Sequence, residues 1–149
     1  MTIFLRRLLL VIAIIAAVGF VDASYLTLQH YIGFPAVCLS ANGCEVALTS
    51  EYATTFGLPT AFLGMLYYLA MFLFALLAMR SGRRSHRWCI LFGSVVGLLA
   101  SAWFVYLQFW VIGAVCLWCM FSAGTSLALF LLSLVFVADE LFIISHLRS

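Results

Sequence analysis

Four long apolar runs dominate this chain and constrain its fold more than any other feature. They cover about residues 8–28, 59–79, 88–112 and 115–137. Each is close to the ~20 residues that a helix needs to cross the hydrocarbon core of a bilayer. Of the 149 residues, 67% are hydrophobic and 8% are charged, which excludes an ordinary soluble domain. Because the runs are long and do not alternate, they predict helices rather than barrel strands. We expect one all-α integral membrane domain over residues 1–149, folded as a four-transmembrane-helix bundle.

The arginines predict how the bundle is oriented. All seven basic residues are arginines, and they lie at Arg6 and Arg7, in the segment 80–87, and at Arg148. The positive-inside rule places these segments, and therefore both termini, in the cytoplasm. The loop 29–58 and the start of the fourth helix then lie outside, in the periplasm or an equivalent lumen. A cleaved signal peptide over residues 1–24 is an alternative, but its apolar run is long for a signal core. Either interpretation leaves the loop outside.

The outer loop 29–58 is too apolar to extend freely into water. We expect it to pack on the bundle as a lid that caps a pocket. Gly33, the pair Asn42-Gly43 and Gly57 supply turn signals. Between these turns the sequence predicts one short helix on the membrane surface, from Glu45 to Phe56.

Four of the five cysteines form two pairs, Cys38/Cys44 in the outer loop and Cys116/Cys119 at the start of the fourth helix. The short spacing of the loop pair makes a disulfide sterically easy. The second pair is a C-x-x-C, which places both sulfurs on one helix face. If Cys116 lies in the first helical turn, the dipole and free amides stabilise its thiolate. Cys119 then lies about one turn deeper, within reach of a membrane-soluble oxidant.

These pairs leave three interpretations open. Two pairs on one membrane face favour thiol–disulfide redox cycling, whereas two static disulfides or a four-thiolate zinc site are the alternatives. Zinc is disfavoured because no histidine accompanies the C-x-x-C. Cys89, beside Arg87, is most simply a buried apolar thiol.

Two other ionisable residues lie near the outer face. Asp22, inside the first run, is a functional candidate because intramembrane acids are costly, and a proton-coupled four-helix exporter is therefore a rival class. We expect Asp22 to hydrogen-bond loop backbone, Tyr25 or Thr27. His30 is expected to be a solvated interfacial side chain.

Several stretches together resemble the vitamin K epoxide reductase family, specifically its bacterial quinone-linked disulfide-forming members. They are Asp22-Ala-Ser-Tyr25-Leu-Thr27, Cys38, Cys44-Glu-Val-Ala-Leu-Thr-Ser50-Glu-Tyr52, Phe56-Gly-Leu-Pro59, Gly64 and Cys116-x-x-Cys119. The resemblance extends over the whole four-helix core. The order of the pairs, loop first and C-x-x-C on helix four, differs from that of the DsbB type of quinone-linked oxidase.

The resemblance implies a relay in a bacterial inner (cytoplasmic) membrane, with the cysteine pairs on the periplasmic face. A separate periplasmic thioredoxin-fold protein, DsbA-like, is expected to attack Cys38. Cys44 then attacks Cys116, and Cys119 passes two electrons to a quinone of the ubiquinone or menaquinone type. Ser50 matches a loop hydroxyl that resembles a local stabiliser of the charged intermediate.

Two positions depart from the vertebrate members of that family. By this resemblance, Ala123 lies at the position where the vertebrate enzymes have a tyrosine near the quinone, and Thr60 lies where they have an asparagine. Both departures weaken the alternative function, vitamin K epoxide or quinone reduction with the same cysteines. Thr60, Ala123 and Cys119 remain the expected contacts of the quinone.

Overall fold

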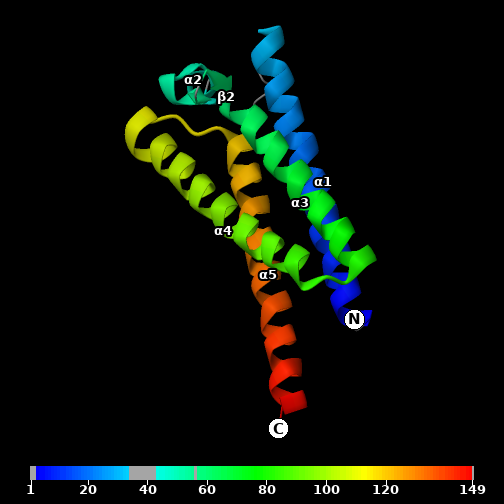
Figure 1. Ribbon diagram of the computed structural model, residues 1–149. Coiled ribbons are helices and arrows are strands. Elements are labelled where there is room, and N and C mark those ends of the chain that lie inside the picture. Colours follow the sequence, from blue (N-terminus) through cyan, green and yellow to red (C-terminus); the bar gives the residue numbers. More distant parts are fainter. Residues whose placement is uncertain (1–2, 34–42, 56, 149) are drawn as a thin grey trace.

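The chain folds into four long helices with a small cap at one end. The computed structural model describes residues 3–33, 43–55 and 57–148, with side chains as far as residue 139. The elements, in chain order, are α1 (Ile3–Ile32), α2 (Gly43–Thr49), the 3₁₀ turn η1 (Glu51–Ala53), β1 (Thr54–Thr55), β2 (Leu58–Pro59), α3 (Thr60–Ser81), α4 (Arg84–Tyr106), the π-helical turn η2 (Leu107–Ile112) and α5 (Leu117–Arg148). Four helical stretches are long and apolar enough to cross a membrane: Ile3–Ile32, Thr60–Ser81, Arg84–Ile112 and Leu117–Asp139. The predicted all-α, four-span fold is confirmed (Figure 1).

The helices form a closed bundle in which α1 packs against α3 and α5, and α4 packs against α5 and α3. Figure 1 shows both chain ends at the end of the bundle opposite to α2. The interior is filled by apolar side chains from α1, α3, α4 and α5, including Leu9, Ile12, Met71, Ile90, Leu129 and Phe136. Gly19 on α1 lies directly against the Tyr68 ring of α3, so a larger residue at position 19 would force these two helices apart.

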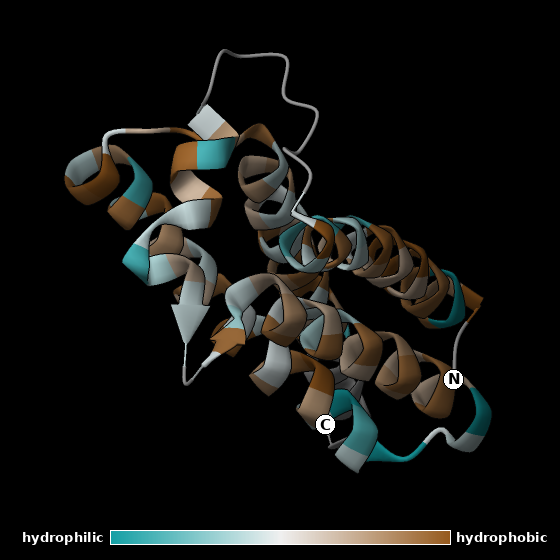
Figure 2. Cartoon of the chain, turned by 90° about the horizontal axis from the view of Figure 1, so that it is seen from above, coloured by the Kyte–Doolittle hydropathy of each residue, from teal (hydrophilic) through white to brown (hydrophobic). Residues whose placement is uncertain are grey.

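The outer surface of the bundle is apolar. Large hydrophobic side chains are exposed along every long helix, among them Val18, Leu69, Phe92, Leu99 and Leu131. Figure 2 shows apolar residues along most of the length of the helices. A surface of this kind fits lipid rather than water, because lipid tails contact apolar side chains without hydrogen-bonding to them.

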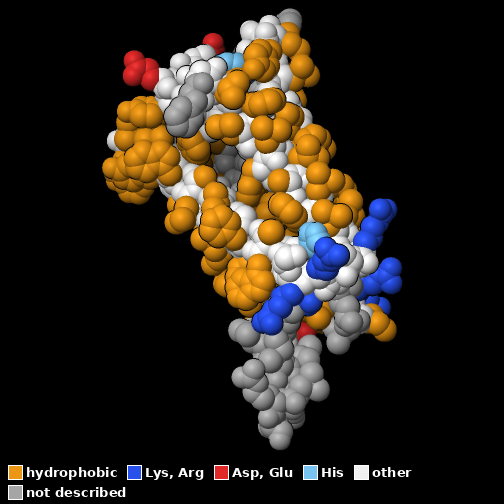
Figure 3. Space-filling view, viewed as in Figure 1, with side chains coloured by type: hydrophobic (Ala, Val, Ile, Leu, Met, Phe, Trp, Pro, Cys, Tyr) orange, Lys and Arg blue, Asp and Glu red, His pale blue; other side chains and the backbone are white. Residues whose placement is uncertain are grey.

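The arginines gather at one end of the bundle. Figure 3 shows their side chains at the end where α3 turns into α4 and α1 begins, whereas acidic side chains lie both at the α2 end and beside the arginines. Arg6 and Arg7 are in the first turns of α1, and Arg80 to Arg87 surround the α3–α4 turn. The arginines of α1 and of the α3–α4 turn therefore lie at the same end, as the predicted topology requires.

The helices extend beyond the predicted apolar runs. α1 begins at Ile3 and ends at Ile32, where Gly33 has a φ of 71° and donates its N–H to the Gln29 carbonyl. α3 ends in the same way at Gly82, which has a φ of 62°. Hydropathy marks only the part of a helix that lies in hydrocarbon, whereas the helix itself continues until a left-handed glycine stops it.

The cap differs from the single helix predicted for residues 45–56. α2 ends at Thr49, and the chain continues as η1 and a two-residue antiparallel bridge that pairs Thr54 with Pro59. Gly57 has a φ of 78° within the connection between the two strands. The positive φ and the β-branched threonines favour a tight hairpin over a continued helix.

Candidate active site

The C-x-x-C lies where α5 begins. The helix starts at Leu117, so Cys116 precedes its first turn instead of lying within it. The Cys116 carbonyl accepts the Met120 N–H at 3.0 Å, and its Sγ accepts the Cys119 N–H at 3.3 Å. Cys116 therefore takes the position of an N-cap, with sulfur in place of the usual side-chain oxygen.

These hydrogen bonds favour the thiolate of Cys116. A hydrogen bond from the Cys119 side chain, assisted by the backbone N–H groups of Cys119 and Trp118, lowers the pKa of Cys116 to about 7. Burial and the negative charge of Asp22 act in the opposite direction on this pKa. A thiol with a pKa near neutrality is partly ionised at physiological pH and reacts readily in disulfide exchange.

The outer-loop pair meets the C-x-x-C through Cys44. Cys38 lies outside the described residues, whereas Cys44 is the second residue of α2 and takes part in a disulfide. Cys44 and Cys116 are both at most 1% exposed and share one small core with Ala47, Leu48, Trp118 and Cys119. The structure therefore brings Cys44 of the loop and Cys116 of the C-x-x-C together.

This approach depends on Gly43. A Cβ on Gly43 would lie 2.6 Å from the carbonyl oxygen of Val115, the residue before Cys116. Only glycine lets the start of α2 lie so close to the backbone that leads into the C-x-x-C. In sequence terms Gly43 was only a turn signal.

The free cysteines include both members of the C-x-x-C and Cys89, and only Cys89 differs from its expectation. Cys116 and Cys119 are both free thiols in this structure. Cys89 is exposed rather than buried, because it lies near the first turn of α4 on the outer side of the bundle.

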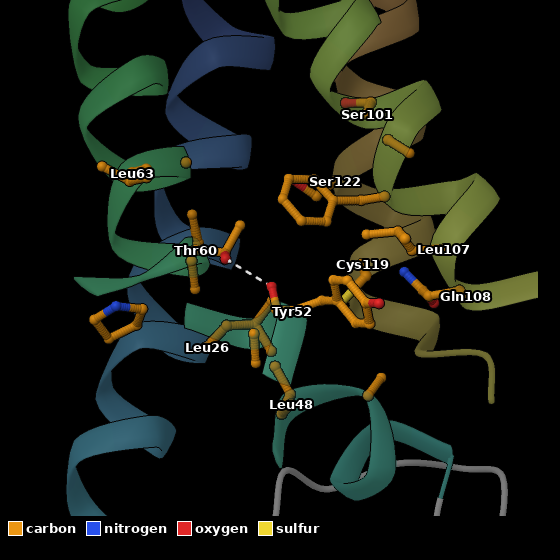
Figure 4. A pocket seen from close by; sticks show the side chains of 18 of the residues that line it. Leu26, Leu48, Tyr52, Thr60, Leu63, Ser101, Leu107, Gln108, Cys119 and Ser122 are labelled. Atoms are coloured by element: carbon orange, nitrogen blue, oxygen red, sulfur yellow. Dashed lines mark hydrogen bonds between the residues drawn. The ribbon is translucent and has the colours of Figure 1, made fainter. Parts of the chain in front are cut away.

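A cavity of about 320 Å³ lies beside the C-x-x-C, beneath the cap (Figure 4). The sequence-predicted residues Cys119, Ser50, Thr60 and Ala123 all line it, while Cys116 and Cys44 do not. Its remaining lining is mainly apolar and includes Leu26, Leu48, Leu63, Phe104, Leu107 and Ile112. In Figure 4 the Cys119 sulfur lies between α5 and the cap, facing this space.

The hydroxyls at the cavity differ in how they are bonded. Thr60 donates to the Tyr52 carbonyl at 3.3 Å, which ties α3 to the cap. Ser50 donates to the Ala47 carbonyl at 2.8 Å and closes the end of α2. Ala123 contributes only its methyl group.

Two tyrosines of α3 bring phenols to the same cavity. The Tyr68 hydroxyl lies 2.7 Å from Thr125 Oγ1 and 3.0 Å from both Ser122 Oγ and Ser126 Oγ, all on α5. The Tyr67 hydroxyl is buried and has no hydrogen-bond partner among the described residues. Both side chains line the cavity, where the Tyr68 hydroxyl reaches the stretch of α5 that contains Ala123 and the Tyr67 hydroxyl lies against Gly97 of α4.

Asp22 is buried beside the C-x-x-C but does not make the expected hydrogen bonds. It is 4% exposed, and neither carboxyl oxygen has a partner within the described part of the chain. The Thr27 hydroxyl instead donates to the Ala23 carbonyl at 2.7 Å, and the Tyr25 ring lies 5.1 Å from the Trp118 ring. His30, by contrast, is exposed at the cavity rim as expected.

Sequence reasoning missed three residues of the site, Gln108, Tyr67 and Tyr68. Gln108 is 4% exposed, lines the cavity, and its Oε1 accepts the Cys116 N–H at 2.8 Å. A signal was present, because Gln108 is the only amide side chain in the run 88–112. A polar side chain within an apolar span usually faces the bundle interior.

Comparison with known proteins agrees with this site. The profile of the Vitamin K epoxide reductase family matches residues 10–134. The Thiol-disulfide oxidoreductase LTO1 of Arabidopsis thaliana is 33% identical over 123 residues, which cover 75% of this chain and 32% of that relative. The chain thus spans about a third of the length of this curated relative. The resemblance stated from the cysteine pairs is confirmed, and the chain is a multi-pass membrane protein that belongs to the vitamin K epoxide reductase family.

Proposed function

We propose that this chain is a membrane thiol:quinone oxidoreductase that re-oxidises a thioredoxin-fold, DsbA-like protein. One observation supports this function above the others: the two sulfurs of the C-x-x-C are placed differently. Cys116 is buried in the small core that it shares with Cys44 and does not line the cavity, whereas Cys119, at the edge of the same core, also lines the cavity. Electrons that enter through the loop pair can therefore leave through a different sulfur into a separate pocket.

The cavity fits a quinone ring in size and chemistry. Its volume of about 320 Å³ is within the range of small-molecule pockets. A quinone is a flat apolar ring with two carbonyl oxygens that accept hydrogen bonds. The apolar lining suits the ring, and the Thr60 hydroxyl at the same wall could donate to a quinone carbonyl in place of its long bond to the Tyr52 carbonyl. The methyl group of Ala123 offers no hydrogen bond, which favours a simple quinone over an epoxide as substrate.

The first half of the reaction is thiol–disulfide exchange. A thiolate of the partner attacks Cys38 of the loop disulfide, and Cys44 leaves as a thiolate. The second thiol of the partner then displaces Cys38, so the partner is oxidised and the loop pair holds two electrons. Cys44 next attacks the Cys116–Cys119 disulfide at Cys116, and Cys119 is released. Cys38 closes the loop disulfide again by displacing Cys116.

The second half oxidises the C-x-x-C. When bound, the quinone accepts two electrons and two protons and becomes a quinol. Cys119 is the thiol that donates to it, and the Cys116 thiolate then forms the disulfide with Cys119. Two thiols lose two protons and two electrons, and one S–S bond forms. The low pKa of Cys116 keeps that nucleophile available near neutral pH.

We further propose that the cysteine end faces the periplasm of a bacterium and the arginine end its cytoplasm. The clustering of the arginines at one end in Figure 3 supports this orientation, because arginines are retained on the cytoplasmic side. Cys89 lies toward the arginine end of α4 and is exposed, so it can report the topology. A membrane-impermeant maleimide should label Cys89 only after the inner membrane is opened.

The decisive test is quinone reduction by purified protein in detergent. Reduced DsbA-like protein and ubiquinone-1 are supplied, and quinone loss is followed by absorbance. Serine at Cys38, Cys44, Cys116 or Cys119 should each abolish turnover, whereas Cys89→Ala should retain it. Turnover that persists without either pair excludes this function. The partner is identified separately with Cys44→Ala: the Cys38 thiol, now without Cys44, should attack the disulfide of the oxidised partner and hold it as a mixed disulfide.

A further inference from the structure

Gln108 links the C-x-x-C to the cavity. It lies in η2, the π-helical turn that follows α4, and its Oε1 accepts the Cys116 N–H at 2.8 Å. Its side chain is almost fully buried and lines the cavity next to Cys119. The Gln108 side chain therefore contacts the backbone of Cys116, the nucleophile, and also reaches the cavity that Cys119 lines.

The hydrogen bond to Cys116 fixes which way the amide points. A backbone N–H can only donate, so the oxygen of Gln108 must face Cys116 and the nitrogen must face the other way. In Figure 4 this nitrogen points into the cavity, toward Cys119 and Ser122. Within the described residues, Nε2 has no hydrogen bond. A donor without a protein partner is thus presented to the ligand space.

The π-helical turn explains why an amide points inward here. Leu107 and Gln108 are buried, while the next three residues, Phe109, Trp110 and Val111, are exposed. On the outer side, the rings of Trp103, Tyr106 and Trp110 stack with centroid separations of 5.8 and 5.6 Å. This stack holds the turn from outside, and such wide turns often occur at functional sites.

We propose that Gln108 is a catalytic residue of the quinone site: its Nε2 donates a hydrogen bond to a quinone carbonyl while its Oε1 holds the Cys116 backbone. This inference rests on the proposed function. As Cys119 donates electrons, negative charge grows on the carbonyl oxygen, and a fixed amide donor at that oxygen stabilises it. Because the same side chain also holds the Cys116 backbone, it fixes the position of the quinone relative to the thiol that forms the disulfide.

The test separates the donor from the acceptor of the amide. Gln108→Glu keeps an oxygen for the Cys116 N–H but has a donor only while it is protonated. Gln108→Met removes both. The matched control is Gln29→Glu, the same substitution at the chain's other glutamine, which does not line the cavity. Binding of ubiquinone-1 is measured by quenching of tryptophan fluorescence between pH 5 and 9, independently of turnover.

We expect Gln108→Met to raise the Kd for ubiquinone-1 roughly fivefold at every pH, the size of one net hydrogen bond. Gln108→Glu should bind normally at low pH and weaken as the pH rises, whereas the wild type and Gln29→Glu should show no such pH dependence. The carbonyl stretch of bound ubiquinone-1 should shift upward in Gln108→Glu at pH 9. If wild type binds quinone and Gln108→Glu matches it in affinity and carbonyl frequency throughout, this role is wrong and the proposed function stands. If wild type neither binds nor reduces ubiquinone-1, the proposed function fails as well.

Discussion

Alanine in place of Gly43 should slow electron transfer between the two cysteine pairs while leaving quinone reduction intact. The added Cβ would lie 2.6 Å from the Val115 carbonyl oxygen, and an ordinary contact begins at 3.4 Å. Either α2 or the segment before Cys116 must therefore move by about 0.8 Å, since a backbone oxygen cannot rotate away as a side chain can. Cys44 is the next residue in α2, so the displacement acts directly on the distance between the Cys44 and Cys116 sulfurs.

The expected magnitudes separate this effect from loss of stability. Overpacking costs about 1–3 kcal/mol, and replacing glycine by alanine in a helix returns up to about 1 kcal/mol. The net loss of about 0–3 kcal/mol leaves the protein folded. A displacement near 1 Å between reacting groups, in contrast, slows a reaction by about 10²-fold. We therefore expect a 10- to 100-fold slower exchange between the pairs in a protein of nearly normal stability.

Two half-reactions measured by stopped flow test this reasoning. In the first, reduced DsbA-like protein is mixed with oxidised enzyme, and reduction of the Cys116–Cys119 disulfide is followed. In the second, chemically reduced enzyme is mixed with ubiquinone-1. Gly43→Ala should slow only the first. Gly124→Ala is the matched control, because an added Cβ at Gly124 meets nothing within 4 Å. Equal rates for Gly43→Ala and wild type in the first half-reaction, or equal losses in both, refute the reasoning.

Three further predictions concern ionisation and packing. The thiolate absorbance of reduced protein should rise with a midpoint near pH 7, because a hydrogen bond from Cys119 and the backbone amides lower the pKa of Cys116. Disulfide formation should therefore slow as the pH falls below 7. A midpoint near pH 9 contradicts this prediction. Asp22→Asn should move the same midpoint to lower pH, since the charge of Asp22 acts to raise the pKa of Cys116. An unchanged or higher midpoint argues against the proximity of Asp22 and Cys116. Tyr68→Phe should lower the free energy of unfolding by about 1–3 kcal/mol, because the buried Tyr68 side chain loses its hydroxyl contacts with Ser122, Thr125 and Ser126 of α5. Tyr106→Phe, on the exposed side of α4, should change the free energy little in the same denaturation assay.

The sequence was most informative where a single physical rule acts alone. Hydropathy identified the four spans, because a bilayer needs about 20 apolar residues whatever the neighbouring helices do. It could not locate the ends of α1 and α3, which extend to Gly33 and Gly82, because a helix stops where its backbone conformation changes rather than where lipid ends. The cap was predicted poorly for a related reason, since α2, η1 and the short hairpin depend on how the loop packs on the bundle.

The sequence by itself determined the fold class, the four cysteines in two pairs, and the family that their order resembles. Spacing along one chain is sufficient for these, because helix length and the C-x-x-C are local properties. Only the tertiary structure decided which sulfur has which neighbour. It placed Cys44 and Cys116 in one small core, put Cys119 at the wall of the cavity, and left the Asp22 carboxyl without a hydrogen-bond partner among the described residues. It also brought Gln108 and Tyr68 into the site from other helices. Such contacts join residues that are distant in sequence, and they depend on helix rotation and close packing, which no local pattern specifies.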